Sequence, residues 1–198
     1  MTALFALKQS LEAFDHYQKQ IVECDQQMAQ HISSLETKAE PSRSLKAARR
    51  VNQKRRNQMA FNVREEAFRI SGVDLTQIDG INESAALGLI SEIGINMSAW
   101  PTEKHFASWL TLCPNNKISG GRVLQRRPRK SANRARNILC FCAQTLLRSR
   151  SALGAYCRRI CSRLGKPKGL IATAHKMALL IYRMLKYGRD YADIGQEQ

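Results

Sequence analysis

Apolar residues spaced by seven run through the first part of the chain and predict one long helix over residues 4–35. The repeat and its companion positions are occupied by Leu4, Leu7, Leu11, Phe14, Ile21, Met28, Ile32 and Leu35. Gln18 and Asp25 interrupt the companion positions. Such a heptad is typical of a coiled-coil seam, where polar residues set register or partner number. We expect a coiled-coil, self-associating arm over residues 1–37; the alternative is that this face packs against the rest of the chain.

The heptad pattern stops after this arm, and residues 38–62 are predicted to be a basic linker. Pro41 and Ser42 interrupt the helix. Seven cations follow without an acid between them: Arg43, Lys46, Arg49, Arg50, Lys54, Arg55 and Arg56. Few apolar residues are available there for burial, so the segment is either an open linker or a helix that forms on nucleic acid. Its contacts would be with phosphates and would carry little sequence information.

A helix-hairpin-helix-like segment is predicted over residues 73–94. Ile78-Asp79-Gly80-Ile81-Asn82 is followed by apolar pairs at helical spacing, Ala85-Ala86 and Leu89-Ile90. A tight turn of this kind directs the backbone N–H groups of a helix N-terminus at a phosphate. We expect Gly80 and Asn82 to form a DNA-contacting turn, with Asn82 in the left-handed conformation that Asn tolerates. An ordinary helix–turn–helix corner is the alternative.

The rest of the chain reads as helices separated by turn residues, so the expected fold class is mainly α. Trp100-Pro101 sets a turn and Thr102 is an N-cap candidate for a helix that directs Phe106, Trp109 and Leu110 to the core. No alternating strand pattern is recognisable. The expected fold is an N-terminal coiled-coil helix followed by a helical domain over 63–190 and a tail over 191–198. Later helices are expected at Ala132–Leu147, Ala152–Leu164 and Leu170–Tyr187, with Lys166-Pro167-Lys168-Gly169 separating the last two.

The charge of the chain indicates a polyanionic partner. Its 198 residues carry 32 Lys+Arg against 16 Asp+Glu, a formal net charge of +16. Nucleic acid fits this excess, because cations that neutralise phosphates release condensed counterions; the cations are not laid out as a membrane anchor. From Lys104 to Arg189 there are 20 Lys and Arg and no Asp or Glu. This half therefore lacks the carboxylate oxygens that Mg²⁺ prefers, and it lacks a carboxylate general base.

Cysteine usage and the N-terminus predict a reduced, cytoplasmic protein. The first residues have neither the basic region nor the long apolar core of a signal peptide, and no apolar run has membrane-spanning length. Six cysteines are present, and none is expected in a disulfide. Cys140-x-Cys142 and Cys157-xxx-Cys161 lie in helix-like sequence rather than on the turns of zinc knuckles. We therefore expect no metal site on this chain.

The candidate chemistry lies in a turn-rich loop over residues 113–130. Ser119 stands before the pair Gly120-Gly121, inside the most basic part of the chain. A hydroxyl on a glycine turn among guanidinium groups suggests phosphate chemistry; a solvated basic loop is the alternative. The cations expected to contact nucleic acid are Lys117, Arg122, Arg126, Arg127, Arg129, Lys130, Arg134 and Arg136.

Several stretches resemble the C-terminal half of the IS110-type, bridge-RNA-guided insertion-sequence transposases. They are ISEIG, WPTEKHFASWLTLCPNNKISGG, ANRARNIL, SALGAYCRRICSRLGKPK and ATAHKMALLIYRMLKYG, and ALKQSLEAFDHYQKQIVECDQQM resembles the coiled-coil segment of that family. The resemblance implies DNA transposition, with a serine that attacks a DNA phosphodiester and becomes covalently linked to it. Ser119 matches that serine, and Gly120 and Gly121 match small residues that allow close backbone approach.

The same resemblance implies partners and a cofactor outside this sequence. DNA and a structured guide RNA are the expected partners, together with a second copy bound through residues 4–35. Mg²⁺ is expected only on an N-terminal resolvase-like domain with an Asp-Glu-Asp-Asp tetrad, which would precede the coiled coil. We therefore expect a fragment of a transposase. The alternatives are an inactive, dimerising nucleic-acid-binding remnant and a basic ribosome- or nucleoid-associated protein.

Overall fold

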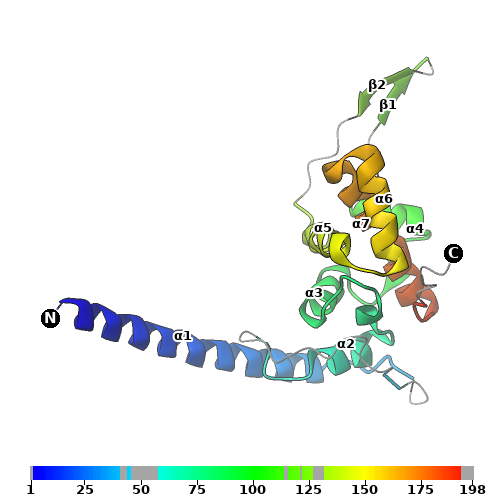
Figure 1. Ribbon diagram of the computed structural model, residues 1–198. Helices are drawn as coiled ribbons and strands as arrows, with labels where there is room; N and C mark the ends of the chain where they lie inside the picture. Colours follow the sequence, from blue (N-terminus) through cyan, green and yellow to red (C-terminus); the bar gives the residue numbers. More distant parts are fainter. Residues whose placement is uncertain are drawn as a thin grey trace.

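The helices predicted from the sequence form an extended arm and a helical body (Figure 1). The computed structural model describes residues 2–40, 44–45, 58–113, 116–120, 122–126 and 132–192. Most of the predicted basic linker therefore lies outside the described residues, and the expectation of a mainly α fold is confirmed. The elements are α1 (Thr2–Ser33), α2 (Val63–Ser71), η1 (Leu75–Gln77), α3 (Glu83–Ile93), η2 (Met97–Ala99), α4 (Glu103–Trp109), β1 (Asn116–Ser119), β2 (Arg122–Arg126), α5 (Arg134–Thr145), η3 (Leu146–Arg148), α6 (Ala152–Leu164) and α7 (Lys166–Tyr187).

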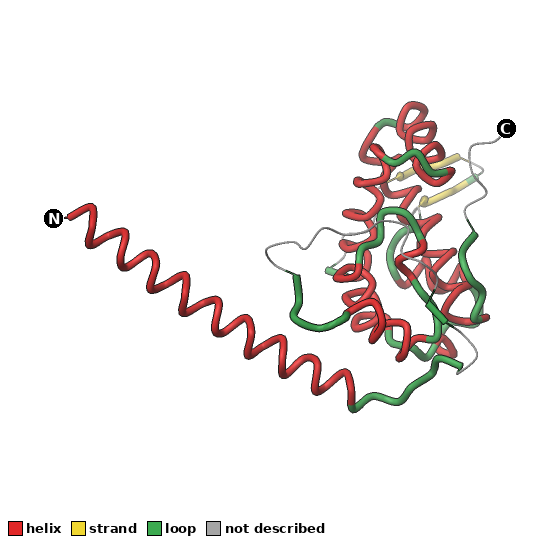
Figure 2. The backbone as a smooth tube through the Cα atoms, turned by 60° about the horizontal axis from the view of Figure 1, so that its bottom comes forward, coloured by secondary structure: helices red, strands yellow, loops and turns green. Residues whose placement is uncertain are grey.

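The arm is the helix α1, which projects away from the body as a single rod (Figures 1 and 2). It spans 32 residues, so the prediction of one long N-terminal helix is confirmed. Its apolar side chains are exposed over most of its length: Leu4, Leu7, Leu11, Phe14, Ile21 and Met28. Packing of this face against the body is therefore limited to the C-terminal part of the arm, where Ile32 joins the core.

Arg69 of α2 attaches the end of the arm to the body. Its guanidinium donates to the carbonyl oxygens of Ile32 at 2.6 Å and Leu35 at 2.8 Å. Ile32 lies in the last turn of α1, where carbonyl oxygens have no partner within the helix, and Leu35 follows two residues after the helix ends. Asp25, a polar interruption of the heptad, is buried and accepts a hydrogen bond from the backbone N–H of Ala60 at 2.9 Å. In the single chain, Asp25 therefore fixes a returning segment to the arm.

The core of the body is built around α7, which packs against α4, α5 and α6. Phe106 of α4, Leu139 of α5 and Met177 of α7 are fully buried. Tyr182 of α7 is buried too, and its hydroxyl donates to the carbonyl oxygen of Trp100 at 2.8 Å. A buried hydroxyl needs such a partner, and this bond holds the turn before α4 against the last helix. No described helix is both apolar enough and long enough to span a bilayer.

Two local expectations about these helices are wrong. The segment from Lys166 to Gly169, expected to separate two helices, is the first turn of α7. Pro167 is tolerated there because N–H groups in the first helical turn have no partner within the helix. Trp109 was expected in the core with Phe106 and Leu110, but it is 40% exposed. Its ring lies on Trp100, with centroids 4.9 Å apart, at the rim of the aromatic cluster.

A β-hairpin replaces the turn-rich loop predicted between α4 and α5. Strands β1 and β2 pair antiparallel, with a register shift between Lys117 and Ile118. Its sequence lacks the apolar–polar alternation of a half-buried strand, which is why no strand was predicted. Figure 1 shows the hairpin lying apart from the helices of the body.

Candidate nucleic-acid interface

Ser119 is the last residue of β1 and lies at the tip of the hairpin. The register pairs Ser119 directly with Arg122, the first residue of β2, which leaves a two-residue connection between the strands. Ser119 and Gly120 are exposed. The chain therefore presents the candidate serine at the end of a ribbon, where a bulky partner can reach it.

The glycine after Ser119 is explained by the turn itself. Gly120 has a φ of +54°, and the two-residue turns that suit the twist of a hairpin need a positive φ at their first position. No heavy atom lies within 4 Å of a Cβ built on Gly120. The turn conformation therefore accounts for glycine at this position, whether or not a backbone also approaches a phosphate there. Gly121 lies outside the described residues.

The predicted cations of the serine loop follow the hairpin. Lys117 lies on β1, and Arg122 and Arg126 lie on β2. Three cations lie outside the described residues: Arg127, Arg129 and Lys130. Since β1 and β2 are adjacent, the hairpin brings Lys117, Arg122 and Arg126 onto one two-stranded ribbon with Ser119.

The two arginines that open α5 have different environments. Arg134 has an 81% exposed side chain and makes a loose ion pair with Glu92 of α3, at 3.5 Å. An exposed pair of this kind contributes about 0–1 kcal/mol, so the guanidinium can exchange the carboxylate for a phosphate. Arg136 is half-buried, and within the described residues its buried Nε has no hydrogen-bond partner. Of the two, Arg134 is the more exposed to a large partner.

The helix-hairpin-helix-like turn has a different geometry from the expected one. Asn82 has an extended backbone, with a φ of −91°, so the prediction of a left-handed Asn82 is wrong. It is instead the N-cap of α3, and its side-chain oxygen accepts from the N–H of Ala85 at 2.8 Å. The positive φ belongs to Gly80, at +90°. Gly80 faces α5, because a Cβ there would lie 2.8 Å from the carbonyl oxygen of Cys142.

Gly80→Ala is expected to destabilise the body more than Gly94→Ala. Both glycines have a positive φ, but a Cβ at Gly94 meets no atom within 4 Å. The strained backbone is thus common to both variants, and the clash with Cys142 is specific to Gly80. Overpacking of this kind should lower the free energy of unfolding of Gly80→Ala by about 1–3 kcal/mol more than that of Gly94→Ala. Chemical denaturation of both variants measures the difference; equal losses would show that α5 moves away without cost.

The four cysteines in the C-terminal helices belong to the packing between them. Cys142 of α5 and Cys157 of α6 are buried, and the Cys157 thiol lies 3.6 Å from the carbonyl oxygen of Ala143. Burial raises the pKa of Cys142 to about 11, so its thiol stays protonated at neutral pH. Within the described ranges, no group of three or more His, Cys, Asp or Glu side chains could hold a metal ion.

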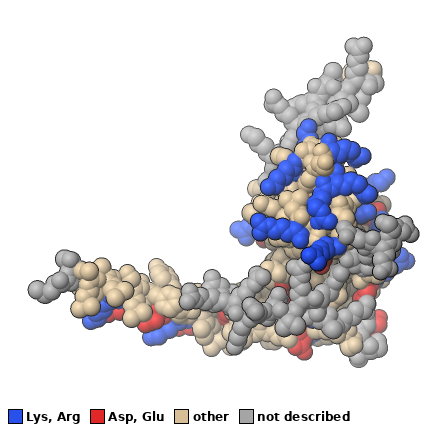
Figure 3. All heavy atoms as spheres, in the orientation of Figure 1, with Lys and Arg blue, Asp and Glu red and all other residues tan. Residues whose placement is uncertain are grey.

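A basic surface covers the body near the hairpin. Figure 3 shows Lys and Arg side chains gathered over the part of the body that contains α5–α7, whereas acidic side chains lie on α1 and along the opposite edge. Glu103 is neutralised by Arg183, whose hydrogen bond outweighs desolvation and lowers the pKa of Glu103. Arg158 is exposed and donates a hydrogen bond to the carbonyl oxygen of Ser149. The exposed cations of α5–α7 and η3 include Arg134, Arg148, Arg159, Arg163, Lys166, Lys168 and Lys176.

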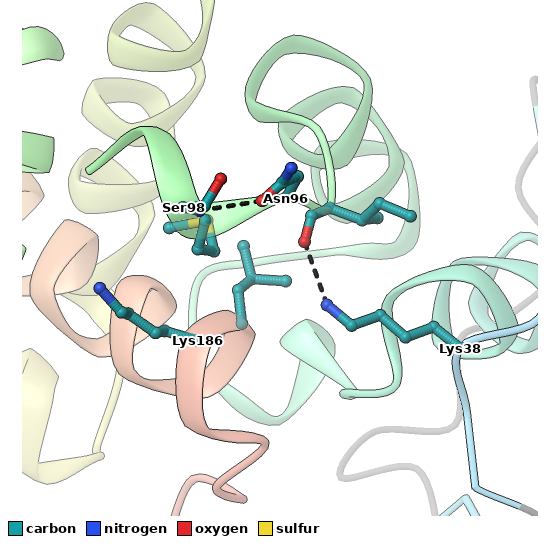
Figure 4. Close-up of a pocket in the computed structure, with 7 residues that line it drawn as sticks. Lys38, Asn96, Ser98 and Lys186 are labelled. Atoms are coloured by element: carbon teal, nitrogen blue, oxygen red, sulfur yellow. Dashed lines mark hydrogen bonds between the residues drawn. The ribbon is translucent and has the colours of Figure 1, made fainter. Parts of the chain in front are cut away.

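A shallow groove of about 400 Å³ lies where the arm meets the body (Figure 4). Its two lysines bind protein groups. Lys38 donates to the carbonyl oxygen of Ile95 at 3.0 Å, and Lys186 donates to the carbonyl oxygens of Trp100 and Pro101 and to the hydroxyl of Tyr182. These lysines connect backbone segments, and we assign the groove a structural role.

The prediction from sequence missed the outer face of α5. This helix was treated as an apolar helix opened by two arginines, but its solvent-facing side carries an exposed phenylalanine, Phe141. A helical projection would have revealed it, because Phe141 is seven residues after Arg134 and therefore lies on the same face. Outside α1, Phe141 is the most exposed large apolar residue in the described part of the chain.

Comparison with known proteins supplies one match. Residues 74–158, from η1 to α6, match the model of the Transposase IS116/IS110/IS902 family. The matched region includes the turn at Gly80, the whole serine hairpin and α5. No curated protein and no solved structure matches the chain. The part of this chain that presents Ser119 and the α5 face is therefore similar to a transposase family, which supports a role in DNA transposition.

Proposed function

We propose that this chain contributes the nucleophile and part of the DNA-binding surface of a transposase, with Ser119 attacking a DNA phosphodiester. The observation that carries the proposal is the presentation of Ser119 at the exposed tip of a basic hairpin within the region similar to transposases. The excess of cations supports DNA and a structured guide RNA as the polyanionic partners.

The proposed step exchanges one phosphate ester for another. Ser119 Oγ forms a bond to phosphorus while the bond from phosphorus to one deoxyribose oxygen breaks. The hydroxyl proton of the serine passes to a base, and the departing deoxyribose oxygen takes up a proton. Because the number of phosphate ester bonds is unchanged, the serine-linked intermediate can rejoin a new strand without a nucleotide cofactor. Fixed cations stabilise the charge that builds on the phosphoryl oxygens.

Residues 104–189 offer Ser119 no carboxylate base, and their histidines are His105 on α4 and His175 on α7. A serine hydroxyl is a weak nucleophile until a base or a metal ion activates it. This region has no carboxylate, and the described residues do not assemble a metal-binding cluster. The donors around the serine hairpin therefore do not fit Mg²⁺. We propose that a separate, carboxylate-bearing domain supplies the metal ion, as the family resemblance implies.

The arm is proposed to associate with the arm of a second copy. Its exposed heptad is the apolar surface that a coiled coil buries. Phe14→Glu combined with Ile21→Glu places charges in this seam, and we expect self-association to weaken by about tenfold or more. Sedimentation equilibrium measures the dissociation constant of self-association. His16→Glu, on the opposite face of α1, is the matched control. Equal weakening by the control would contradict a heptad interface.

The experiment that tests the proposed function is the capture of a covalent protein–DNA adduct. The full chain is incubated with labelled DNA in the presence of a resolvase-like metal domain, and the products are separated under denaturing conditions. The proposal predicts a labelled band at the mass of the protein plus DNA that disappears on protease digestion. If every labelled adduct contains the metal domain instead, this chain does not supply the nucleophile.

A further inference from the structure

One side of α5 and η3 carries a continuous set of exposed polar side chains with a single aromatic ring at its centre. We call this set the outer stripe of α5; its members are Arg134, Asn137, Phe141, Gln144, Thr145 and Arg148. All six are exposed, and each lies three or four residues from at least one other member along one helical face. The opposite face, with Ala135, Leu139 and Ala143, is buried. The stripe is therefore the solvent side of an amphipathic helix.

Phe141 is not explained by the packing of the described chain. It is 72% exposed, although it belongs to a helix whose other apolar residues are buried or half-buried. The aromatic rings of the body that have neighbours, such as Trp100 and Phe106, pack together at the start of α4. An exposed ring beside amides and arginines can stack on a partner that offers an open aromatic face.

Three polar members of the stripe have no hydrogen bond from their side chains among the described residues, whereas the Thr145 hydroxyl donates to the carbonyl oxygen of Cys142 at 2.8 Å. Within the part of the chain that the structure describes, no hydrogen bond is made by the side-chain amides of Asn137 and Gln144 or by the guanidinium of Arg148. Arg134 has its loose pair with Glu92. Amides can hydrogen-bond to base edges, and arginines bind phosphates. The stripe thus has a side chain for each part of a nucleotide. The arginines suit the phosphate backbone, the amides suit the base edges and the phenylalanine ring suits the base face.

The neighbours of the stripe favour a polyanion. Helices α3 and α5 run antiparallel, since Gly88 faces Ile138 and Glu92 pairs with Arg134. The turn at Gly80 therefore lies beside the C-terminal end of the stripe. The segment from Lys104 to Arg189 contains no acid, so no carboxylate on α5, α6 or α7 opposes a phosphate. The acids beside the stripe are Glu92 of α3, which pairs with Arg134, and Asp79 in the turn, which accepts a hydrogen bond from Ser149. Figure 3 shows cations on the same part of the body.

We propose that the outer stripe of α5 binds single-stranded DNA, with an unpaired base stacked on the ring of Phe141 and the backbone held by Arg134 and Arg148. Stacking on an aromatic side chain requires an open base face, which a duplex does not expose. The choice of DNA rests on the proposed function, since strand cleavage and transfer produce unpaired DNA. The stacking contact itself is separate from the serine chemistry.

The test measures binding of the full chain to two fluorescent 15-nucleotide strands, one of deoxythymidine and one made only of abasic deoxyribose phosphates. Phe141→Ala is expected to weaken binding of the thymidine strand about tenfold, the order of one lost stacking contact. Binding of the abasic strand should change less than about twofold, because phosphate contacts remain. Phe141→Trp should retain the affinity for thymidine. The substitutions lie on the surface, and circular dichroism verifies the fold.

Tyr187→Ala is the matched control, because Tyr187 is also an exposed aromatic residue of the body and is 59% exposed. It should leave both affinities unchanged. An equal loss on both strands in Phe141→Ala, or no loss on either, would overturn the stacking proposal. A larger loss of affinity for a duplex or for a uridine strand than for the thymidine strand would also overturn the proposal. An effect of Phe141→Ala on self-association alone would overturn it too. Ser119→Ala should bind both strands like the natural chain, so failure of the serine chemistry is distinguishable from failure of this site.

Discussion

Ser119→Ala is expected to abolish the covalent protein–DNA adduct while leaving DNA binding unchanged. Alanine removes the only atom proposed to bond to phosphorus, so no residual adduct is expected. Ser119 is exposed at the tip of the hairpin, and a surface substitution of this kind changes the free energy of unfolding by about 0.5 kcal/mol or less. Denaturing electrophoresis with labelled DNA and an added metal domain measures the adduct.

Ser162→Ala provides the matched control for this loss. Ser162 is an exposed serine on α6, outside the hairpin, and its removal should leave the adduct intact. Binding of both variants should weaken with salt in parallel, because the phosphate contacts are unchanged. An adduct that persists in Ser119→Ala would show that another residue is the nucleophile. Loss of the adduct in Ser162→Ala as well would indicate a general defect.

Asp74→Ala is expected to lower the free energy of unfolding by about 3–5 kcal/mol, the usual loss when one partner of a buried ion pair is removed. Asp74 is buried and accepts hydrogen bonds from Arg64, Thr76 and Gln77. These bonds connect α2 to η1, just before the turn at Gly80. Alanine would leave the half-buried guanidinium of Arg64 without its carboxylate. Urea denaturation measures the change.

The exposed pair of Lys8 and Glu12 on α1 provides the control for Asp74. Its charged atoms are 3.8 Å apart at the surface, and Glu12→Ala should change the free energy of unfolding by less than about 0.5 kcal/mol. A loss in Asp74→Ala as small as that in Glu12→Ala would show that water replaces the carboxylate around Arg64.

The same carboxylate predicts how stability depends on pH. Burial alone would raise the pKa of Asp74, but hydrogen bonds from Arg64, Thr76 and Gln77, together with the charge of Arg64, outweigh it and lower the pKa. A lowered pKa in the folded chain means that the stabilisation is complete above the unfolded pKa of about 3.9 and is lost as the pH falls through the folded value. Stability should therefore fall less steeply with acid in Asp74→Ala than in the natural chain.

Local sequence patterns were sufficient to predict most of the helices. The heptad predicted α1, and the N-cap Thr102 with its following apolar residues predicted α4, because hydrophobic periodicity and capping are properties of neighbouring residues. The hairpin was missed for the same reason. Its strands pair with each other, and their short sequences have no apolar–polar alternation to recognise. The two glycines were recognised, but their turn could be identified only once Ser119 was paired with Arg122.

The roles of individual polar residues depended on contacts distant in sequence. Asp25 interrupts a heptad, yet its partner is the backbone of Ala60, 35 residues away. Gly80 and Asn82 were both assigned to the turn, but their conformations are set by different neighbours. Gly80 must be glycine because α5 crosses it, and Asn82 is extended because it caps α3.

By itself, the sequence determined a basic, mainly helical chain with an apolar-faced arm, a serine beside two glycines and no carboxylate from Lys104 to Arg189. These properties follow from composition and local order, which need no knowledge of packing. Only the tertiary structure decided that Ser119 lies at the tip of a hairpin, that Arg136 turns inward while Arg134 remains exposed, and that Phe141 lies outside the core. Which face of a helix meets solvent is set by the elements packed on its other face.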